Sequence, residues 1–483
     1  MRAALGFLVV TIAFAFTSFS AWPGSTWPFL AFHCGMIGMV ALALVGPVSY
    51  AYGFLASFLF LGFWGKLVAH LLAGLPFIEP TGLFDGSPAA WDSAMLVAAA
   101  AALGVASARA IQLVFLSRRT VASPIQVRPA PRFYVCYRKP MWILALLAVL
   151  ALNLWNVEAA FYQIGVNPRL VLPAHLNVAI AWLINWGFAL GVACLVHWEI
   201  RFRPQNASIA LLGAFVEAAA ASISSLSRSA YLFHGMAGLL AWFEVRRRWV
   251  ARAGWQMLAW VIVAFALGFA ATLVIVQTLR ADRYFADIND LRISQNYEAN
   301  KSVGKEMFST QTERQLYLKG MLMQIPFLVV NRWVGLEAVL AVSAHTEKGP
   351  ALFSAAIRED PKRGVDSIFQ RIAGSGYERS VRFTFLTLAG APALLYYSGS
   401  LAVVISGMLL LTALLLATDA LARRWTGNPF VVSLAGISMA YTVTQVTFPY
   451  LAAIFFLQLL CTLAVIALLE RAGKANLSAH PHE

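Results

Sequence analysis

The chain has 483 residues, of which 60% are hydrophobic and only 12% are charged, and its formal net charge is +14. A soluble globular domain carries about 25% charged residues, so this composition excludes an ordinary soluble protein. The apolar residues stand in long blocks, and a block of about 20 such residues crosses a bilayer as a helix.

These blocks predict an all-α polytopic membrane protein with about twelve spans and one large, partly helical hydrophilic loop. The first span could also be a signal peptide, but its positively charged start is minimal and we expect it to be retained. The predicted spans are 4–21, 28–47, 50–73, 91–116, 141–161, 175–197, 206–224, 229–244, 256–277, 391–417, 429–447 and 450–469. Four regions follow: a bundle of about nine spans at 1–276, the loop domain at 277–388, about three spans at 389–470 and a tail at 471–483.

Lysine and arginine indicate the orientation of the bundle. They crowd alternate short loops, for example at Arg118–Arg119, Arg246–Arg248 and Arg423–Arg424, whereas the other short loops hold only Arg169. Because positive charge marks the cytoplasmic side, we expect both termini in the cytoplasm and the large loop on the outer side of the membrane. The net charge then mostly encodes orientation, and no nucleic-acid partner is expected.

The large loop contains an apolar stretch, Met321–Ala344, that is interrupted by Asn331, Arg332 and Glu337. A charge at the centre of a span costs about 2.5–3.5 kcal/mol on insertion scales. We therefore expect this stretch to pack on the outer face of the membrane or to re-enter it.

Polar residues inside apolar helices are candidates for function because burying them is unfavourable. Most of them fall in the predicted outer half of the bundle, which favours a site at the outer surface. The alternative is that each one reaches the interface or pairs with a neighbouring helix. Tyr396 and Tyr397 could stack on sugar rings or belong to an interfacial aromatic belt. The candidates for lining the site are Lys66, Glu79, Glu217, His234, Tyr396 and Tyr397.

Two segments carry the groups best suited to chemistry. The junction of the seventh and eighth spans reads SISSLSRSAYLFHG (222–235), and the guanidinium of Arg228 suits phosphate oxygens. The segment NRWVGLEAVLAVSAHTEKG (331–349) holds Arg332, Glu337 and His345. No zinc spacing, phosphate-binding loop or dinucleotide fingerprint occurs, so neither a metal nor a cofactor is predicted.

Many spans with one large outer loop late in the chain, together with Ser227-Arg228 at an outer helix junction, resemble the O-antigen polymerase and ligase group. The chain is most similar to the Wzy-like oligosaccharide repeat-unit polymerases. The similarity covers most of the chain as topology, but only short stretches as sequence. The ligase branch usually carries a His-Asn pair in the large loop, whereas His345 is followed here by Thr346.

The resemblance implies a GT-C-like, metal-independent glycosyltransferase that polymerises undecaprenyl-diphosphate-linked oligosaccharides into a cell-surface polysaccharide. It implies cations for the departing diphosphate and a base for the acceptor hydroxyl. Its expected partners are the lipid-linked oligosaccharide, the bilayer, a chain-length regulator and a flippase. We assign Arg228 and Arg332 to the diphosphate, with Arg283 and Arg169 as helpers, and Glu337 and then His345 as the base.

Three other functions stay open. An O-antigen ligase would share the layout. A flippase or transporter would be expected to show polar residues through the midplane and internal symmetry, and the sequence shows neither. A scaffold of an envelope complex would use the large loop as a partner surface.

Overall fold

The computed structural model describes residues 2–117, 130–249, 255–285, 330, 333–376 and 386–478. Its helices up to the large segment are α1 Arg2–Phe19, α2 Thr26–Ala43, α3 Tyr50–Leu59, η1 Phe60–Gly65, α4 Lys66–Ala73, α5 Pro88–Ser117, α6 Arg132–Ala159, α7 Ala174–Trp182, η2 Leu183–Gly187, α8 Phe188–Phe202, η3 Pro204–Asn206, α9 Ala207–Ser224, α10 Ala230–Trp249 and α11 Trp255–Phe285. Those that follow are α16 Leu336–Ala344, α17 Pro350–Ile357, η5 Pro361–Asp366, α18 Ile368–Ala373, α19 Gly390–Tyr396, α20 Leu401–Thr426, α21 Pro429–Thr444 and α22 Pro449–Ser478.

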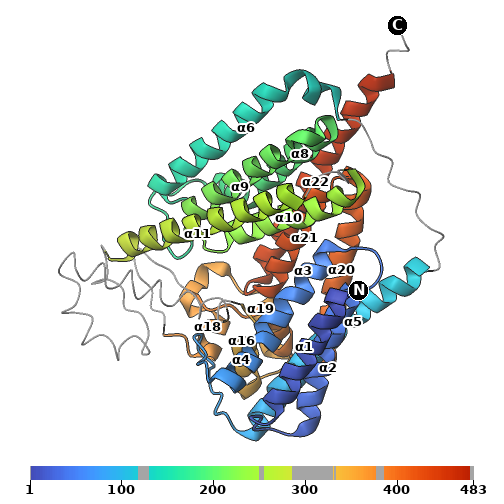
Figure 1. Cartoon of the computed structure of the whole chain (residues 1–483). Coiled ribbons are helices and arrows are strands. Elements are labelled where there is room, and N and C mark those ends of the chain that lie inside the picture. The colour runs from blue at the N-terminus through green and yellow to red at the C-terminus, as the bar shows by residue number, and fades with distance from the viewer. Residues whose placement is uncertain are drawn as a thin grey trace.

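The helices form two groups that share a central seam (Figure 1). Helices α6, α8, α9, α10 and α11 lie side by side in one group, and α1, α2, α3 and α5 form the other. Helix α20 packs on α5, whereas α21 packs on α3 on one side and on α8 and α10 on the other. The seam helices α20 and α21 therefore hold the two groups together.

Nine helices of the described residues are long and apolar enough to cross a membrane. The same part of the chain contains no strand, so the protein is an all-helical, multi-pass membrane protein. The twelve predicted spans each coincide with one or more helices. Of the remaining three, Gly6–Phe19 and Pro429–Thr444 are shorter apolar helices, and α10 ends in a charged run that includes Glu244 and Arg246.

The predicted start of the tenth span at residue 391 is wrong. Helix α19 ends at Tyr396, and the spanning helix α20 begins only at Leu401. Gly399 separates the two helices with a φ of +72°, a left-handed conformation that favours glycine. The first residues of the predicted span instead form a separate, buried helix.

Helix α16, the last part of the stretch Met321–Ala344, lies inside the bundle. It packs against α5 and α19, and the side chains of Leu336–Val342 are buried. Residues 321–329, 331 and 332 lie outside the described residues. Part of the large hydrophilic segment is thus integral to the packed core.

Small residues explain how the seam helices approach the others so closely. A Cβ on Gly436 of α21 would lie 2.7 Å from the backbone nitrogen of Ala51 in α3. A Cβ on Gly104 of α5 would clash with the Ile405 carbonyl of α20. Close backbone approach through small residues is a common way to pack helices in a membrane.

Candidate functional site

A pocket opens at the turn between α9 and α10. It encloses about 310 Å³ of space, including the part that is open to its surroundings. The lining comes from four places in the chain: Tyr162 and Ile164, Asn185 and Trp186, residues 225–234 around the turn, and Tyr441 of α21.

The turn itself has an unusual backbone. Leu226 adopts a φ of +53°, which is rare for a residue other than glycine and typically costs about 1–3 kcal/mol. The Arg280 side chain of α11 donates from Nε to the Leu226 carbonyl at 2.8 Å. The Ser227 backbone N–H donates to the Ser222 carbonyl at 2.9 Å, and the Ser222 hydroxyl donates to the Ser227 carbonyl. These contacts hold the turn in the conformation that points its serines at the pocket.

Asn156 of α6 fixes the opposite wall of the pocket. It is fully buried, and its Nδ2 donates to the carbonyls of Tyr162 and Ser224, both at 2.9 Å. Its Oδ1 accepts from the Tyr162 backbone N–H, also at 2.9 Å. One side chain thus ties the segment after α6 to the end of α9.

The wall near Trp186 depends on a π-helical turn. The segment η2, Leu183–Gly187, interrupts the helix formed by α7 and α8, and it carries Asn185 and Trp186. Such π segments are rare and occur frequently at functional sites, because the extra residue re-aims the side chains around it. At Tyr162, burial raises the pKa of the phenol above its ordinary value, so this hydroxyl stays neutral.

The innermost polar groups are His234 of α10 and Glu217 of α9. The Nδ1 atom of His234 lies 3.2 Å from Oε2 of Glu217, and both side chains are at most 3% exposed. The other carboxylate oxygen of Glu217, Oε1, is buried and has no hydrogen-bond partner within the described part of the chain. The Trp186 ring lies against the imidazole, with the centroids 5.1 Å apart.

Two of the residues singled out in the sequence, Glu217 and His234, form the buried pair, and His234 lines the pocket. Arg228 is not among the lining residues, but it stands in the chain between two serines that are, Ser227 and Ser229. Arg228 itself is half-buried. The pocket therefore combines hydroxyls, an amide, aromatic faces and an imidazole at one end of the bundle.

Lys66 and Glu337 pair with each other elsewhere in the bundle. The ammonium of Lys66 lies 2.6 Å and 2.5 Å from the two carboxylate oxygens of Glu337, and both side chains are at most 3% exposed. Glu337 stands in the first turn of α16, where a negative charge interacts favourably with the helix dipole. The pair anchors α16 to α4, close to the π-helical segment η1.

A row of aromatic rings separates the two buried pairs. The Trp333 ring contacts Phe58 at 5.5 Å between centroids, Phe58 contacts Phe233 at 5.3 Å, and Phe233 contacts Tyr441 at 5.1 Å. Phe233 and Tyr441 line the pocket, whereas Trp333 precedes α16. The Lys66–Glu337 pair is not among the residues that line the pocket.

The structure places the other predicted residues apart from the pocket lining. Tyr397 is buried, with 1% of its surface exposed, and Tyr396 is half-buried with the Lys348 ammonium 5.8 Å from its ring centroid. His345 is the half-buried C-cap of α16. Glu79 is half-buried in the loop after α4, and Arg169 is exposed in the segment between α6 and α7. Arg332 and the side chain of Arg283 lie outside the described residues.

Six pocket residues with a polar side-chain atom were not candidates in the sequence: Tyr162, Asn185, Trp186, Ser225, Ser229 and Tyr441. They come from four parts of the chain that are brought together only on folding. The Glu217–His234 pair does have a signal in the sequence. Glu217 precedes Leu226 by nine residues and His234 follows it by eight, so an antiparallel helix hairpin that turns at Leu226 brings them level.

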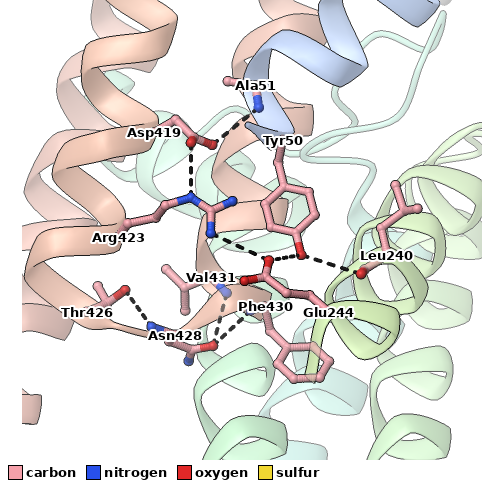
Figure 2. Close-up of polar contacts among 10 residues, drawn as sticks. All are labelled: Tyr50, Ala51, Leu240, Glu244, Asp419, Arg423, Thr426, Asn428, Phe430 and Val431. Carbon is pink, nitrogen blue, oxygen red and sulfur yellow. Dashed lines mark hydrogen bonds and ion pairs between the residues drawn. The ribbon is translucent and has the colours of Figure 1, made fainter. Parts of the chain in front are cut away.

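A second polar cluster crosses the bundle at the other ends of α10 and α21 (Figure 2). Arg423 of α20 contacts Asp419 at 3.2 Å and Glu244 of α10 at 3.5 Å, and its guanidinium lies over the Tyr50 ring. The Tyr50 hydroxyl donates to Glu244 at 2.7 Å. Asn428 caps α21 by accepting from Phe430 and Val431. These contacts cross-link α3, α10 and α20.

Comparisons of the chain with protein-family models, with curated protein sequences and with solved structures found no match. What the site can do chemically therefore follows from its own residues. Neutral hydroxyls and an amide suit the hydroxyl groups of a ligand, and aromatic faces suit flat apolar surfaces. The imidazole beside a carboxylate suits transfer of a proton. Among the described residues, no group of three or more histidine, cysteine, aspartate or glutamate side chains could hold a metal ion.

Proposed function

We propose that the chain is a membrane glycosyltransferase that polymerises undecaprenyl-diphosphate-linked oligosaccharide repeat units into a cell-surface polysaccharide. It would act in the bacterial inner membrane, with the α9–α10 turn facing the periplasm. The observation that carries this proposal is the pocket in which three serines and two aromatic hydroxyls surround a buried imidazole.

The lining supports a sugar as the ligand. A sugar ring presents several hydroxyl groups, which need partners that donate and accept hydrogen bonds. The Asn185 amide and the Ser229 hydroxyl provide both, and the Ser225 hydroxyl, which already donates to the Ala221 carbonyl, can still accept. The C–H faces of a sugar ring pack on aromatic rings, which Trp186 and its neighbours supply.

The position of Arg228 supports a diphosphate at the rim. The turn that carries it lies at the end of α9, at the end of the membrane bundle, which is where the phosphates of a membrane lipid lie. A guanidinium can bind two phosphate oxygens at once and stabilise the charge that develops on a leaving diphosphate. Arg228 thus joins the lipid carrier to the sugar pocket.

Glu337 leaves the set of candidate bases. Both of its carboxylate oxygens contact the Lys66 ammonium, and neither residue reaches the pocket lining. A base must lie within hydrogen-bond reach of the proton that it removes. We assign Glu337 and Lys66 to the packing of α16 instead.

The test is elongation by purified protein in lipid nanodiscs. The substrate is the lipid-diphosphate repeat unit extracted from the cells that carry this protein, and products are read as a gel ladder with mass spectrometry. Removing one group that stabilises developing charge typically lowers the rate about 10²–10³-fold, and we expect this for Arg228→Ala. Arg228→Lys should recover part of the rate, because an ammonium supplies charge without the fork of donors. Arg358→Ala, a change at an exposed site after α17, should leave the ladder unchanged.

Other outcomes of the same experiment would support the alternatives. Movement of the lipid-linked sugar across the bilayer without elongation would indicate a flippase. Transfer of sugar onto a different acceptor lipid, with no ladder, would indicate a ligase. A full-length ladder in Arg228→Ala would contradict the assignment of Arg228.

A further inference from the structure

His234 has the geometry of a histidine that a carboxylate orients. Its Nδ1 faces Oε2 of Glu217 at 3.2 Å, and both side chains are buried. A carboxylate in this position accepts the Nδ1–H and fixes the tautomer in which Nε2 carries the lone pair. His234 lines the pocket, and Nε2 is the ring nitrogen that Glu217 does not engage.

The other described residues that line the pocket offer no comparable base. Its remaining titratable groups are the phenols of Tyr162 and Tyr441, and burial raises the pKa of Tyr162 further. A phenol stays protonated near neutral pH, since its ordinary pKa is about 10. Serine hydroxyls and the Asn185 amide donate and accept hydrogen bonds but do not take up a proton at this pH.

The earlier candidate bases do not line the pocket. Glu337 is paired with Lys66. His345 is the C-cap of α16. His33, another buried histidine, accepts at Nδ1 from the Trp64 indole at 2.9 Å and does not line the pocket.

We propose that His234 is the general base of the transfer and that Glu217 is the residue that positions it. This inference rests on the proposed function and names the residue that the reaction needs. The Nε2 atom of His234 takes the proton of the acceptor hydroxyl while that oxygen forms the new bond to the anomeric carbon. The bond from the anomeric carbon to the diphosphate breaks, and its electron pair leaves with undecaprenyl diphosphate. The proton passes from the imidazolium to water after release of the product.

Four variants and one control test this assignment in the nanodisc assay. We expect His234→Ala to lower the elongation rate about 10²–10⁴-fold, the usual contribution of a positioned base. His234→Asn keeps an amide N–H that can still donate to Glu217 but lacks a basic nitrogen, so it should fold and be equally inactive. Glu217→Gln should lower the rate and Glu217→Asp should retain part of it. His175→Ala, a change at an exposed histidine of α7, is the matched control and should be unaffected.

Chemical rescue separates a base from a residue that only supports the fold. Added imidazole should restore elongation in His234→Ala by at least about tenfold, because it fits the space that the side chain leaves and supplies the missing base. It should not change the control. Intact folding is checked by the elution profile and the thermal unfolding midpoint of each variant.

The results distinguish the two proposals. Wild-type protein that elongates no substrate contradicts the proposed function and the base assignment with it. Wild-type elongation with near-normal rates in His234→Ala and His234→Asn overturns the assignment of the base alone. Folded, inactive His234→Ala that imidazole does not rescue also overturns it, and would make His234 a structural residue of the pocket.

Discussion

Two buried carboxylates of this protein have very different surroundings. Glu337 has both oxygens bound to the Lys66 ammonium at 2.5 Å and 2.6 Å, and it does not line the pocket at the α9–α10 turn. Glu217 has one oxygen 3.2 Å from His234 and the other without a hydrogen-bond partner among the described residues, and its histidine lines that pocket. The first, closed pair has a fully paired carboxylate, whereas the second, open pair has one unpaired oxygen and a histidine at the pocket. The comparison shows that the partners of a buried carboxylate, rather than its residue type, distinguish a structural ion pair from a candidate functional site.

The largest effect on stability is expected at the closed pair, Lys66 and Glu337. Glu337→Gln leaves the Lys66 ammonium buried without its carboxylate, and breaking a buried ion pair in this way costs about 3–5 kcal/mol of unfolding free energy. Thermal unfolding in detergent should show a large fall in the midpoint. The double variant Lys66→Met with Glu337→Leu should recover most of it, because it leaves no uncompensated charge. A double variant as unstable as Glu337→Gln would contradict the anchor role.

The next largest effect on stability is expected at the pocket wall that Asn156 holds in place. Asn156→Ala removes three hydrogen bonds and leaves the carbonyls of Tyr162 and Ser224 without this donor. Each buried group left unsatisfied costs about 1–3 kcal/mol, and we expect a net loss of about 2–3 kcal/mol after relaxation. Elongation should fall as well, because the wall that carries Tyr162 loosens. Unchanged stability and activity would show that the wall is held by other contacts.

A smaller effect on stability is expected at the polar cluster of Tyr50, Glu244 and Arg423, at the other end of the bundle. Tyr50→Phe removes the hydroxyl that donates to Glu244, and a hydrogen bond to a charged group contributes about 1.5–3 kcal/mol at most. Arg423 still contacts Glu244 in the variant, so we expect a loss of about 1–2 kcal/mol. The elongation rate at a permissive temperature should not change. A selective loss of activity would show that this cluster also acts on the pocket.

The smallest effect on stability is expected at the open pair itself. Glu217→Gln replaces a buried, incompletely paired charge with a neutral amide that can still accept from His234 Nδ1. The unfolding free energy should therefore change by less than about 1 kcal/mol, in the stabilising direction, since functional sites often lower stability. The unfolding midpoint of this variant, measured beside that of Glu337→Gln, gives the sharpest form of the comparison. Equal destabilisation by the two changes would remove the distinction between the pairs.

The sequence was enough to predict the helical membrane fold, because apolar blocks about 20 residues long have few alternatives. It also singled out Lys66, Glu217, His234 and Glu337 as polar points in apolar surroundings. Which of these residues pair with each other could be predicted from the sequence only in part. Glu217 and His234 are 17 residues apart on one helix hairpin, where the turn sets the register. Lys66 and Glu337 are 271 residues apart, and no local rule relates them.

The rest of the site could not be predicted for a related reason. Tyr162, Trp186 and Tyr441 come from three separate parts of the chain, and each looks like an ordinary aromatic residue of a membrane helix. Asn185 and Trp186 line the pocket because η2 adds a residue to one helical turn, which periodicity does not reveal. For Tyr397 the error runs the other way. Its position near the start of a predicted span suggested contact with a ligand, but the folded protein buries its side chain.

The hydrogen bond from Arg280 to the Leu226 carbonyl couples α11 to the rim of the pocket. Helix α11 spans the bundle and runs on to Phe285, past residue 277, at which the predicted loop domain begins. The Arg280 side chain of α11 donates to the carbonyl of Leu226, the residue with a strained backbone at the rim of the pocket. Rotation or axial displacement of α11 would therefore be transmitted directly to the rim, and would widen or narrow the pocket mouth without any change at its floor.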